Sequence, residues 1–190
     1  RRAPVGPGGT RDDIQEGHCS HGPVDAVGDD RGFFMESWNA EVFTELGLDI
    51  PFVQDNHSRS QQGVLRGLHY QIQRPQGKLV RVTQGSVFDV AIDIRRSSSF
   101  FGQWAGVHLS AENKRLFWVP PGFAHGFYVT SDVADFQYKC SEYYAPEFDR
   151  AIRWDDPAIG IDWPLVGGAL PALSAKDESA PLLDAADVFD

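Results

Sequence analysis

The sequence predicts a single all-β domain, a sandwich or barrel of short strands with few helices. Its 190 residues suffice for one domain with a substantial core and are too few for us to expect two. From about residue 52 onward, apolar residues alternate with other residues, and glycine, proline, serine and asparagine divide the chain into short segments. Short alternating segments separated by turn residues are typical of β sandwiches and barrels.

The strand signal is clearest after Gly85, where apolar residues occupy every second position. These residues are Phe88, Val90, Ile92 and Ile94. Their spacing predicts a strand with one fully apolar face. Shorter runs predict further strands at residues 79–83, 104–109, 116–119, 127–130 and 134–140.

Helical signals are few. Asn39 is a good N-cap and Gly47 suits the C′ position, so we expect a helix over about residues 40–46. Its apolar stripe consists of Val42, Phe43 and Leu46. From Ser174 onward, the sequence predicts a loop and a short helical turn.

The start of the chain differs from the rest. Residues 1–24 contain five glycines and three prolines and have almost no apolar periodicity, which favours a disordered or loosely attached arm. We therefore expect an atypical, flexible arm over residues 1–27 and a single domain over residues 28–190.

Composition excludes several classes of protein. The net charge of −10 argues against a general nucleic-acid binder or a protein of anionic membranes. No apolar run approaches the roughly 18 residues that a membrane-spanning helix needs. The two cysteines, Cys19 and Cys140, imply no disulfide framework, so we expect a cytoplasmic protein.

Positive charge is concentrated in one window of this acidic chain. Residues 56–88 contain no aspartate or glutamate, but they contain Arg59, Arg66, Arg74, Lys78 and Arg81. This distribution indicates a local site for an anionic ligand. An exposed rim that happens to be basic would give the same composition, and composition leaves both interpretations open.

Two histidines stand in a specific spacing. Gly63 and His69 begin one unit that continues to Gly85, and Pro120-Pro121-Gly122-Phe123-Ala124-His125 forms a second. This spacing resembles the paired motifs of the cupin superfamily, whose fold is a double-stranded β-helix, or jelly roll. The resemblance implies a jelly-roll barrel with a few short helices. In that superfamily, two histidines and a glutamate of the first motif and a histidine of the second bind one metal.

Two of these four metal positions differ here. His69 and His125 remain, but Gln71 replaces the second histidine and Lys78 replaces the glutamate. An ammonium group beside a divalent cation is electrostatically unfavourable, and two imidazoles alone rarely hold a metal tightly. Lys78 itself would supply the positive charge. We therefore expect no metal and no cofactor.

The segments around these motifs are more specific than the cupin spacing. They span residues 30–34, 52–58, 63–71, 76–81, 122–127, 154–157 and 161–164, and they read DRGFF, FVQDNHS, GVLRGLHYQ, QGKLVR, GFAHGF, WDDP and IDWP. From about Gly28 to the C-terminus, the chain resembles the dTDP-4-dehydrorhamnose 3,5-epimerase family. The resemblance implies an isomerase of dTDP-L-rhamnose biosynthesis, which serves lipopolysaccharide or cell-wall polysaccharide. It would convert dTDP-4-dehydro-6-deoxy-D-glucose to dTDP-4-dehydro-L-rhamnose.

The same resemblance implies roles for individual residues. His69 would be the base and Tyr138 the acid on the opposite face of the sugar, with Lys78 facing the enolate. Asp177 resembles the carboxylate that pairs with the base histidine. Arg66 resembles the family's main diphosphate anchor.

Further positions match residues that contact the nucleotide or sugar. These are Gln54, Asn56, His125, Tyr144 and Lys176, together with Asp149, where the family more often has glutamate. Three others, Arg31, Phe34 and Glu36, match residues that the family contributes from the neighbouring subunit. The resemblance therefore also implies a homodimer with shared sites.

Three of these roles compete with structural interpretations. Tyr138 shares a strand face with Phe136 and Cys140, which is typical of a core tyrosine. Asp177 follows Ser174 with the spacing of a capping box. Lys78 also has the position of a charge at a strand end.

Three alternative functions remain from the sequence. One is an epimerase that acts at a single carbon, because its site would contain nearly the same residues. Another is a metal-dependent cupin oxygenase, which Gln71 and Lys78 disfavour. The third is a non-catalytic sugar-nucleotide binding module, in which we would expect the base or the acid to be replaced.

Overall fold

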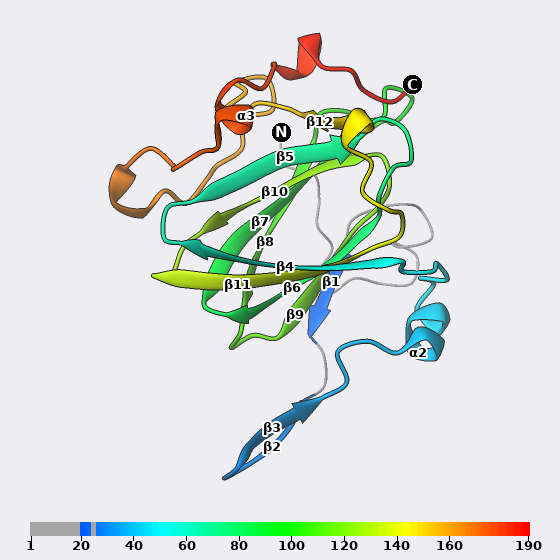
Figure 1. Cartoon of the computed structure of the whole chain (residues 1–190), viewed down its shortest axis with the longest axis vertical. Coiled ribbons are helices and arrows are strands. Elements are labelled where there is room, and N and C mark those ends of the chain that lie inside the picture. Colours follow the sequence, from blue (N-terminus) through cyan, green and yellow to red (C-terminus); the bar gives the residue numbers. More distant parts are fainter. Residues whose placement is uncertain (1–19, 24–25) are drawn as a thin grey trace.

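The computed structural model describes residues 20–23 and 26–190 and confirms an all-β architecture (Figure 1). Two five-stranded antiparallel sheets face one another. The β11 sheet has the order β1 (Ser20–Pro23), β9 (Arg115–Val119), β6 (Lys78–Gln84), β11 (Val133–Cys140) and β4 (Gln54–Gln61). The β5 sheet has the order β12 (Asp149–Ala151), β5 (Leu65–Gln71), β10 (Phe123–Val129), β7 (Ser86–Asp93) and β8 (Trp104–Ser110).

Each predicted strand is present. The largest difference is in β10, which begins at Phe123 rather than at residue 127. His125 therefore lies within the strand, where its Cα is paired directly with that of His69 on β5. The spacing of the two motifs has brought both histidines to the same level of one sheet.

Strand β7 is buried on both faces, whereas the sequence predicted only one apolar face. The predicted face, which includes Phe88 and Val90, packs under the C-terminal part of the chain. The other face, which includes Val87 and Ala91, points between the two sheets. A strand covered on both sides must bury its polar residues too, and Asp89 is accordingly fully buried.

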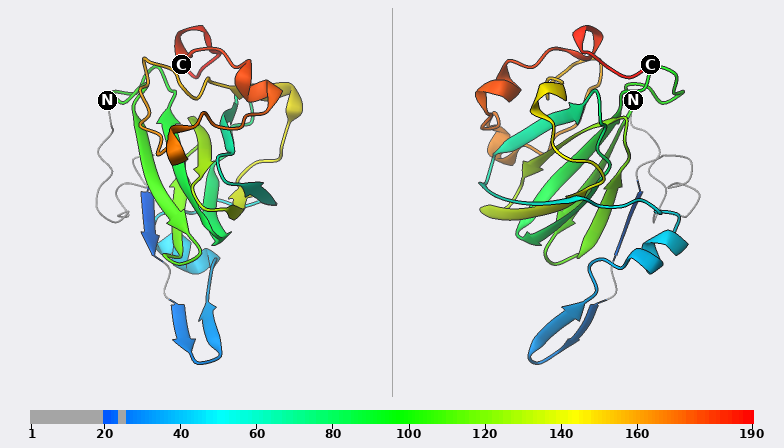
Figure 2. Two further views of the ribbon diagram at one scale, coloured as in Figure 1. Left: turned by 90° about the vertical axis from the view of Figure 1, so that its left-hand side faces the viewer. Right: turned by 45° about the vertical axis from the view of Figure 1, so that its right-hand side comes forward.

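The C-terminal segment, residues 152–190, covers the outer face of the β5 sheet. It is largely irregular and contains the short helix α3 (Ala175–Glu178) and the 3-10 turns η2 (Val166–Gly168) and η3 (Leu183–Ala185). Ile152 exchanges backbone hydrogen bonds with Leu68, and the Tyr70 hydroxyl donates to the carbonyl of Asp187. Figure 2 shows this segment, in orange and red, lying over β5. The predicted loop and helical turn are confirmed.

The N-terminal part includes helix α2 (Ala40–Glu45), as predicted. The Asn39 side chain caps it by accepting from the backbone N–H groups of Glu41 and Val42. Only part of the predicted stripe is covered: Phe43 packs against Trp38, whereas Val42 is exposed.

Strands β2 (Ala26–Asp29) and β3 (Gly32–Met35) form a hairpin that projects beyond both sheets (Figure 2). Phe34 on this hairpin is 77% exposed. Strand β1 lies within the expected arm and pairs with β9, so part of residues 1–27 belongs to a sheet. Residues 1–19 and 24–25 of the arm lie outside the described residues. No helix in the described part of the chain is long and apolar enough to cross a bilayer.

Candidate active site

His69 and Asp177 form the first pair of the site. His69 lies on β5, and its Nε2 is 2.5 Å from Oδ1 of Asp177 in α3. The imidazole is partly exposed, while Asp177 is only 2% exposed. Burial alone would raise the pKa of Asp177, but its contacts with His69, Ser174 and the Gly67 N–H outweigh burial and lower that pKa. The carboxylate is therefore ionised when it meets the imidazole.

A second histidine–carboxylate pair lies deeper between the sheets. His125 on β10 is 6% exposed, and its Nε2 is 2.8 Å from Oδ1 of Asp89 on β7. Lys78 lies at the start of β6 in the opposite sheet, close enough to Asp89 for their charges to act on each other. Burial lowers the pKa of Lys78, and the charges of Asp149 and Asp89 counteract this effect.

Tyr138 lies on β11 and faces the β5 sheet. It packs near Phe136, which confirms the shared strand face, yet its side chain is only partly buried. Burial is the main cause that raises the pKa of Tyr138, and the charge of Arg66 opposes it. Arg66 is exposed on β5, where its Nε donates to Ser60 Oγ at 3.0 Å. The tyrosine hydroxyl thus retains its proton at neutral pH and lies within the electrostatic reach of a guanidinium group.

The predicted contact residues gather at the rim of this site. The backbone N–H of Tyr144 donates to Gln54 Oε1 at 2.9 Å, and the Tyr144 hydroxyl donates to Asp149 Oδ2 at 3.1 Å. Lys176 Nζ lies 2.5 Å from the same Asp149 oxygen. Asn56 on β4 donates from Nδ2 to the buried Cys140 Sγ. Residues from five separate segments are thereby brought together.

Gln71 stands at one of the positions that hold the metal in the cupin superfamily. Both polar atoms of its side-chain amide bind backbone groups of neighbouring loops. Its Nε2 donates to the carbonyls of Arg74 and Tyr143, and its Oε1 accepts from the backbone N–H of Ala145 at 2.7 Å. The amide therefore anchors the segments that border the site. Within residues 20–23 and 26–190, no three histidine, cysteine or acidic side chains are arranged to hold a metal ion.

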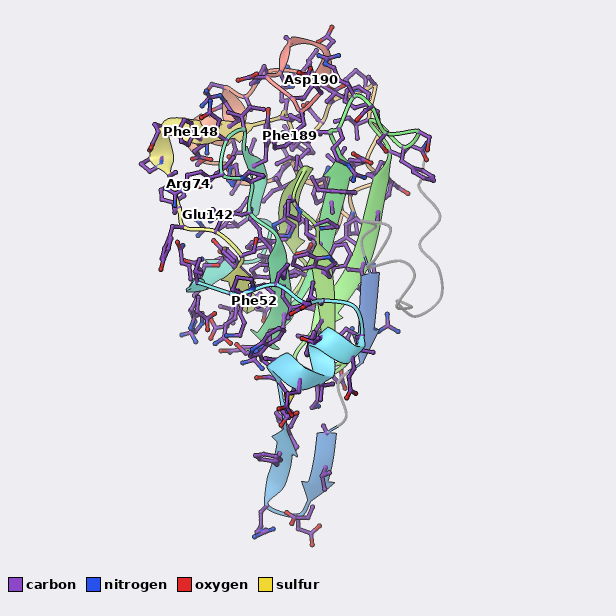
Figure 3. All side chains as sticks on the ribbon, turned by 90° about the vertical axis from the view of Figure 1, so that its right-hand side faces the viewer. Phe52, Arg74, Glu142, Phe148, Phe189 and Asp190 are labelled. Carbon is purple, nitrogen blue, oxygen red and sulfur yellow. The ribbon has the colours of Figure 1, made fainter. Side chains whose placement is uncertain are left out.

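The basic window separates into two groups, and the first includes Arg81, which donates to Gln137 Oε1 at 2.8 Å. Arg59 forms an ion pair with Asp135 at 2.6 Å, and Arg74 forms one with Glu142 at 2.7 Å. Figure 3 shows Arg74 and Glu142 beside one another, away from the hairpin. Arg66 and Lys78 are the members of the window that contribute charge to the site.

Three predicted residues do not join the site of their own chain. Arg31, Phe34 and Glu36 lie on or directly after the projecting hairpin, and all three are exposed. Arg31 instead forms an ion pair with Asp29 on the same hairpin.

Asp89 is the residue of the site that the sequence analysis missed. In the sequence it alternates with the apolar face of its strand and lies between Val87 and Ala91. Those small apolar neighbours were the available signal, since a solvated face would carry more polar residues. A carboxylate between Val87 and Ala91 on such a face indicates a buried polar group with a specific partner.

Comparison with known proteins agrees with this geometry. A family model described as dTDP-4-dehydrorhamnose 3,5-epimerase matches residues 19–185. The chain belongs to the dTDP-4-dehydrorhamnose 3,5-epimerase family. The enzyme of that name from Pseudomonas aeruginosa is 59% identical over 163 residues, which are 85% of this chain and 89% of the relative. The predicted epimerase activity in dTDP-rhamnose biosynthesis is confirmed.

Solved structures confirm the jelly-roll cupin fold. A 3,5-epimerase of Legionella pneumophila, crystallised with dTDP-4-keto-L-rhamnose, has a TM-score of 0.86 and 58% identity, with 89% of each chain covered. A 3′-monoepimerase of Streptomyces bikiniensis, in complex with dTDP-quinovose, has a TM-score of 0.81 and 34% identity, with 87% of this chain and 84% of that chain covered. The fold is thus shared by both kinds of epimerase, and the higher identity lies with the 3,5-epimerase.

Proposed function

We propose that this epimerase inverts C3 and C5 of dTDP-4-dehydro-6-deoxy-D-glucose with His69 as the base and Tyr138 as the acid. The C4 ketone acidifies the hydrogens on both neighbouring carbons, because the electron pair left by each proton is delocalised into an enolate. Inversion follows when a proton returns from the opposite face. The observation that supports this assignment is the location of the two groups, with His69 on the β5 sheet and Tyr138 on the facing β11 sheet.

His69 is prepared to accept a proton. An ionised carboxylate at Nε2 favours a proton on that nitrogen, which leaves Nδ1 unprotonated and able to act as the base. When Nδ1 takes a proton from the sugar, Asp177 stabilises the resulting imidazolium. A positioned base of this kind accelerates a reaction by about 10²–10⁴-fold.

Lys78 and His125 lie where negative charge would develop. The enolate oxygen at C4 needs a cation or a hydrogen-bond donor, and such groups are most effective where water is excluded. Lys78 presents an ammonium group from β6, and His125 presents an imidazole from β10. Lys78 supplies the positive charge that a metal provides in other cupins.

The nucleotide end of the substrate is assigned to the rim. Arg66 has a planar guanidinium group that suits bidentate contact with a diphosphate. Gln54 binds both Asn56 and the backbone of Tyr144, and Asp149 holds Tyr144 and Lys176 through its carboxylate. We expect these residues to contact the nucleotide or the sugar.

The functional unit in this proposal is a homodimer, in which each hairpin completes the partner's site. Arg31, Phe34 and Glu36 project from one chain far from its own His69, as Figure 1 shows for the β2–β3 hairpin. Exposed aromatic and charged side chains of this kind are suited to an interface. We expect the enzyme in the cytoplasm, where its two cysteines would stay reduced.

Deuterium exchange tests the proposed mechanism. With the 4-keto substrate in D₂O, the unaltered enzyme should incorporate deuterium at both C3 and C5. His69→Ala should abolish exchange at both carbons while dTDP binding, measured by calorimetry, survives. As a matched control, His108→Ala removes an exposed histidine of β8 and should leave exchange unchanged. Persistent exchange in His69→Ala would refute the role of His69, and exchange at one carbon would indicate a monoepimerase.

A further inference from the structure

We infer that Asp89 is a positioning residue whose buried carboxylate holds His125 in place and keeps Lys78 charged at the enolate end of the site. This inference deepens the proposed function and rests on it, since it requires Lys78 to face the enolate oxygen. Asp89 does not itself contact the sugar in this proposal. It acts through the two residues beside it.

The geometry of Asp89 is unusual for a carboxylate. Its side chain is fully buried on β7, a strand at the interior of the β5 sheet. Oδ1 is 2.8 Å from His125 Nε2. Among the buried side-chain nitrogens and oxygens of the described residues, Oδ2 of Asp89 is the atom without a hydrogen-bond partner. Most buried carboxylate oxygens are hydrogen-bonded, so this arrangement requires an explanation.

Nearby cations provide that explanation. Burying an isolated carboxylate costs roughly several kcal/mol unless positive charge compensates it. Burial raises the pKa of Asp89, and the charges of His125 and Lys78 oppose that effect. The influence is mutual, because Asp89 opposes the effect by which burial lowers the pKa of Lys78. One carboxylate therefore binds the imidazole of His125 and lies in the field of the Lys78 ammonium group.

The other charged groups around Lys78 cannot replace Asp89. Asp149 is already paired with Lys176 and accepts from the Tyr144 hydroxyl. Lys176 is itself positive and disfavours the charge on Lys78. Burial raises the pKa of the Cys140 thiol, so that residue is neutral at neutral pH. Asp89 is thus the acidic group near Lys78 that has a buried oxygen without a hydrogen-bond partner among the described residues, whereas the carboxylate of Asp149 already pairs with Lys176.

The sign of the expected pH effect follows from this arrangement. The active form of Lys78 is protonated, so its contribution to catalysis is present below its pKa and is lost as pH rises through that pKa. Burial lowers the pKa of Lys78, and the charge of Asp89 counteracts part of that effect. Removing this charge therefore lowers the pKa of Lys78 further. The basic limb of the pH–rate profile should therefore move to lower pH.

Asp89→Asn tests the inference because it removes the charge while keeping the shape. The amide oxygen can still accept from His125 Nε2, so packing is retained. We expect kcat for exchange at C3 and C5 to fall about 10²-fold, as when one stabilising group of an oxyanion is lost. The basic limb should shift to lower pH, and dTDP affinity should be unchanged.

A matched control lies on the same strand. Asp93 is equally buried, but it pairs with Arg95 and Ser98 at the end of β7 rather than with groups of the site. Asp93→Asn should lower Tm and leave kcat and the pH profile as in the unaltered enzyme. Asp89→Glu retains the charge and should keep the basic limb at its original pH, even if the longer side chain lowers kcat.

Several results would overturn the inference. Asp89→Asn with lowered Tm and an unshifted pH profile would show that the residue is only structural. If Asp89→Asn does not fold, the question is decided by acetylating Lys78 in the unaltered enzyme at a series of pH values. Peptide mass spectrometry measures the extent of acetylation. A midpoint below pH 7 contradicts the inference, and a midpoint above pH 7 supports it. Absence of exchange in the unaltered enzyme would instead contradict the proposed function.

Discussion

Asp177 shows how one side chain takes part in two local interactions. Its backbone N–H donates to Ser174 Oγ at 3.2 Å and begins α3, while its carboxylate pairs with His69. The capping spacing seen in the sequence and the pairing implied by the family are therefore both correct and are not alternatives. The cap fixes the backbone of Asp177, and so it fixes the direction of the carboxylate.

Asp177→Asn should be less stable than the unaltered protein at neutral pH, by about 1–3 kcal/mol. Because the folded-state pKa of Asp177 is lowered, its stabilising effect is present above the unfolded-state pKa and is lost as pH falls through the folded-state pKa. The difference between the two proteins in urea unfolding should therefore shrink in acid. The amide would also favour the wrong tautomer of His69, so turnover should fall about 10²–10⁴-fold.

The control for that measurement is Asp162→Asn, an exposed aspartate of the same C-terminal segment. It should change neither turnover nor the dependence of stability on pH. A stability difference between Asp177→Asn and the unaltered protein that stays constant from neutral pH into acid would contradict the pairing as described.

At the scale of elements, β5 and β10 pack closely beside the two histidines. A Cβ added to Gly67 would lie 2.5 Å from the Cα of Gly126, and Gly67 has a φ of +138°. A side chain at this position would push the strands apart near His69 and His125. Close backbone approach at a glycine is therefore part of the site's geometry.

Gly67→Ala should lower the free energy of unfolding by about 1–3 kcal/mol and should reduce turnover, because the backbone itself must move. Gly63→Ala is the matched control: its φ is +80°, but the nearest atom to an added Cβ is the Tyr128 hydroxyl oxygen at 3.9 Å. Chemical denaturation and exchange assays should show a smaller loss of stability for Gly63→Ala and retained turnover. Equal effects of the two substitutions would contradict the importance of close approach.

Local sequence patterns predicted the strands and the helix better than they predicted which residues cover them. Alternation predicted β7, and Asn39 and Gly47 predicted α2, because these signals depend on neighbours in the chain. The burial of both faces of β7 depends on a cover that comes from distant residues, so no local pattern reveals it. For the same reason, His69 was found by its spacing from other motif residues, whereas Asp89 was missed.

At the scale of the whole molecule, the hairpin of one chain does not serve its own site. Phe33 and Phe34 are exposed on it, and Val27 lies exposed on the adjacent strand. The exposed apolar side chains are explained if they pack on a second copy of the chain. Sequence alone indicated this only through the family, because it does not show that a segment points away from its own barrel.

Subunit mixing tests this sharing of residues. His69→Ala and Arg31→Ala should each be inactive alone. After random reassociation of equal amounts, half of the dimers contain one intact site, so roughly a quarter of the original exchange activity should return. The control is a chain carrying both substitutions, mixed with His69→Ala, which should recover nothing. No recovery in the first mixture would contradict shared sites.

The separation between His69 and its carboxylate has a consequence for the synthesis of the protein. The two residues are 108 positions apart in the sequence. A nascent chain that has emerged only through β11 already contains His69, Lys78, His125 and Tyr138, but it lacks both Asp177 and the segment that covers the outer face of the β5 sheet. The C-terminal segment that orients His69 through Asp177 also covers the apolar outer face of the β5 sheet. Catalytic competence in this enzyme is therefore acquired only after Asp177 and the covering segment around it have been synthesised.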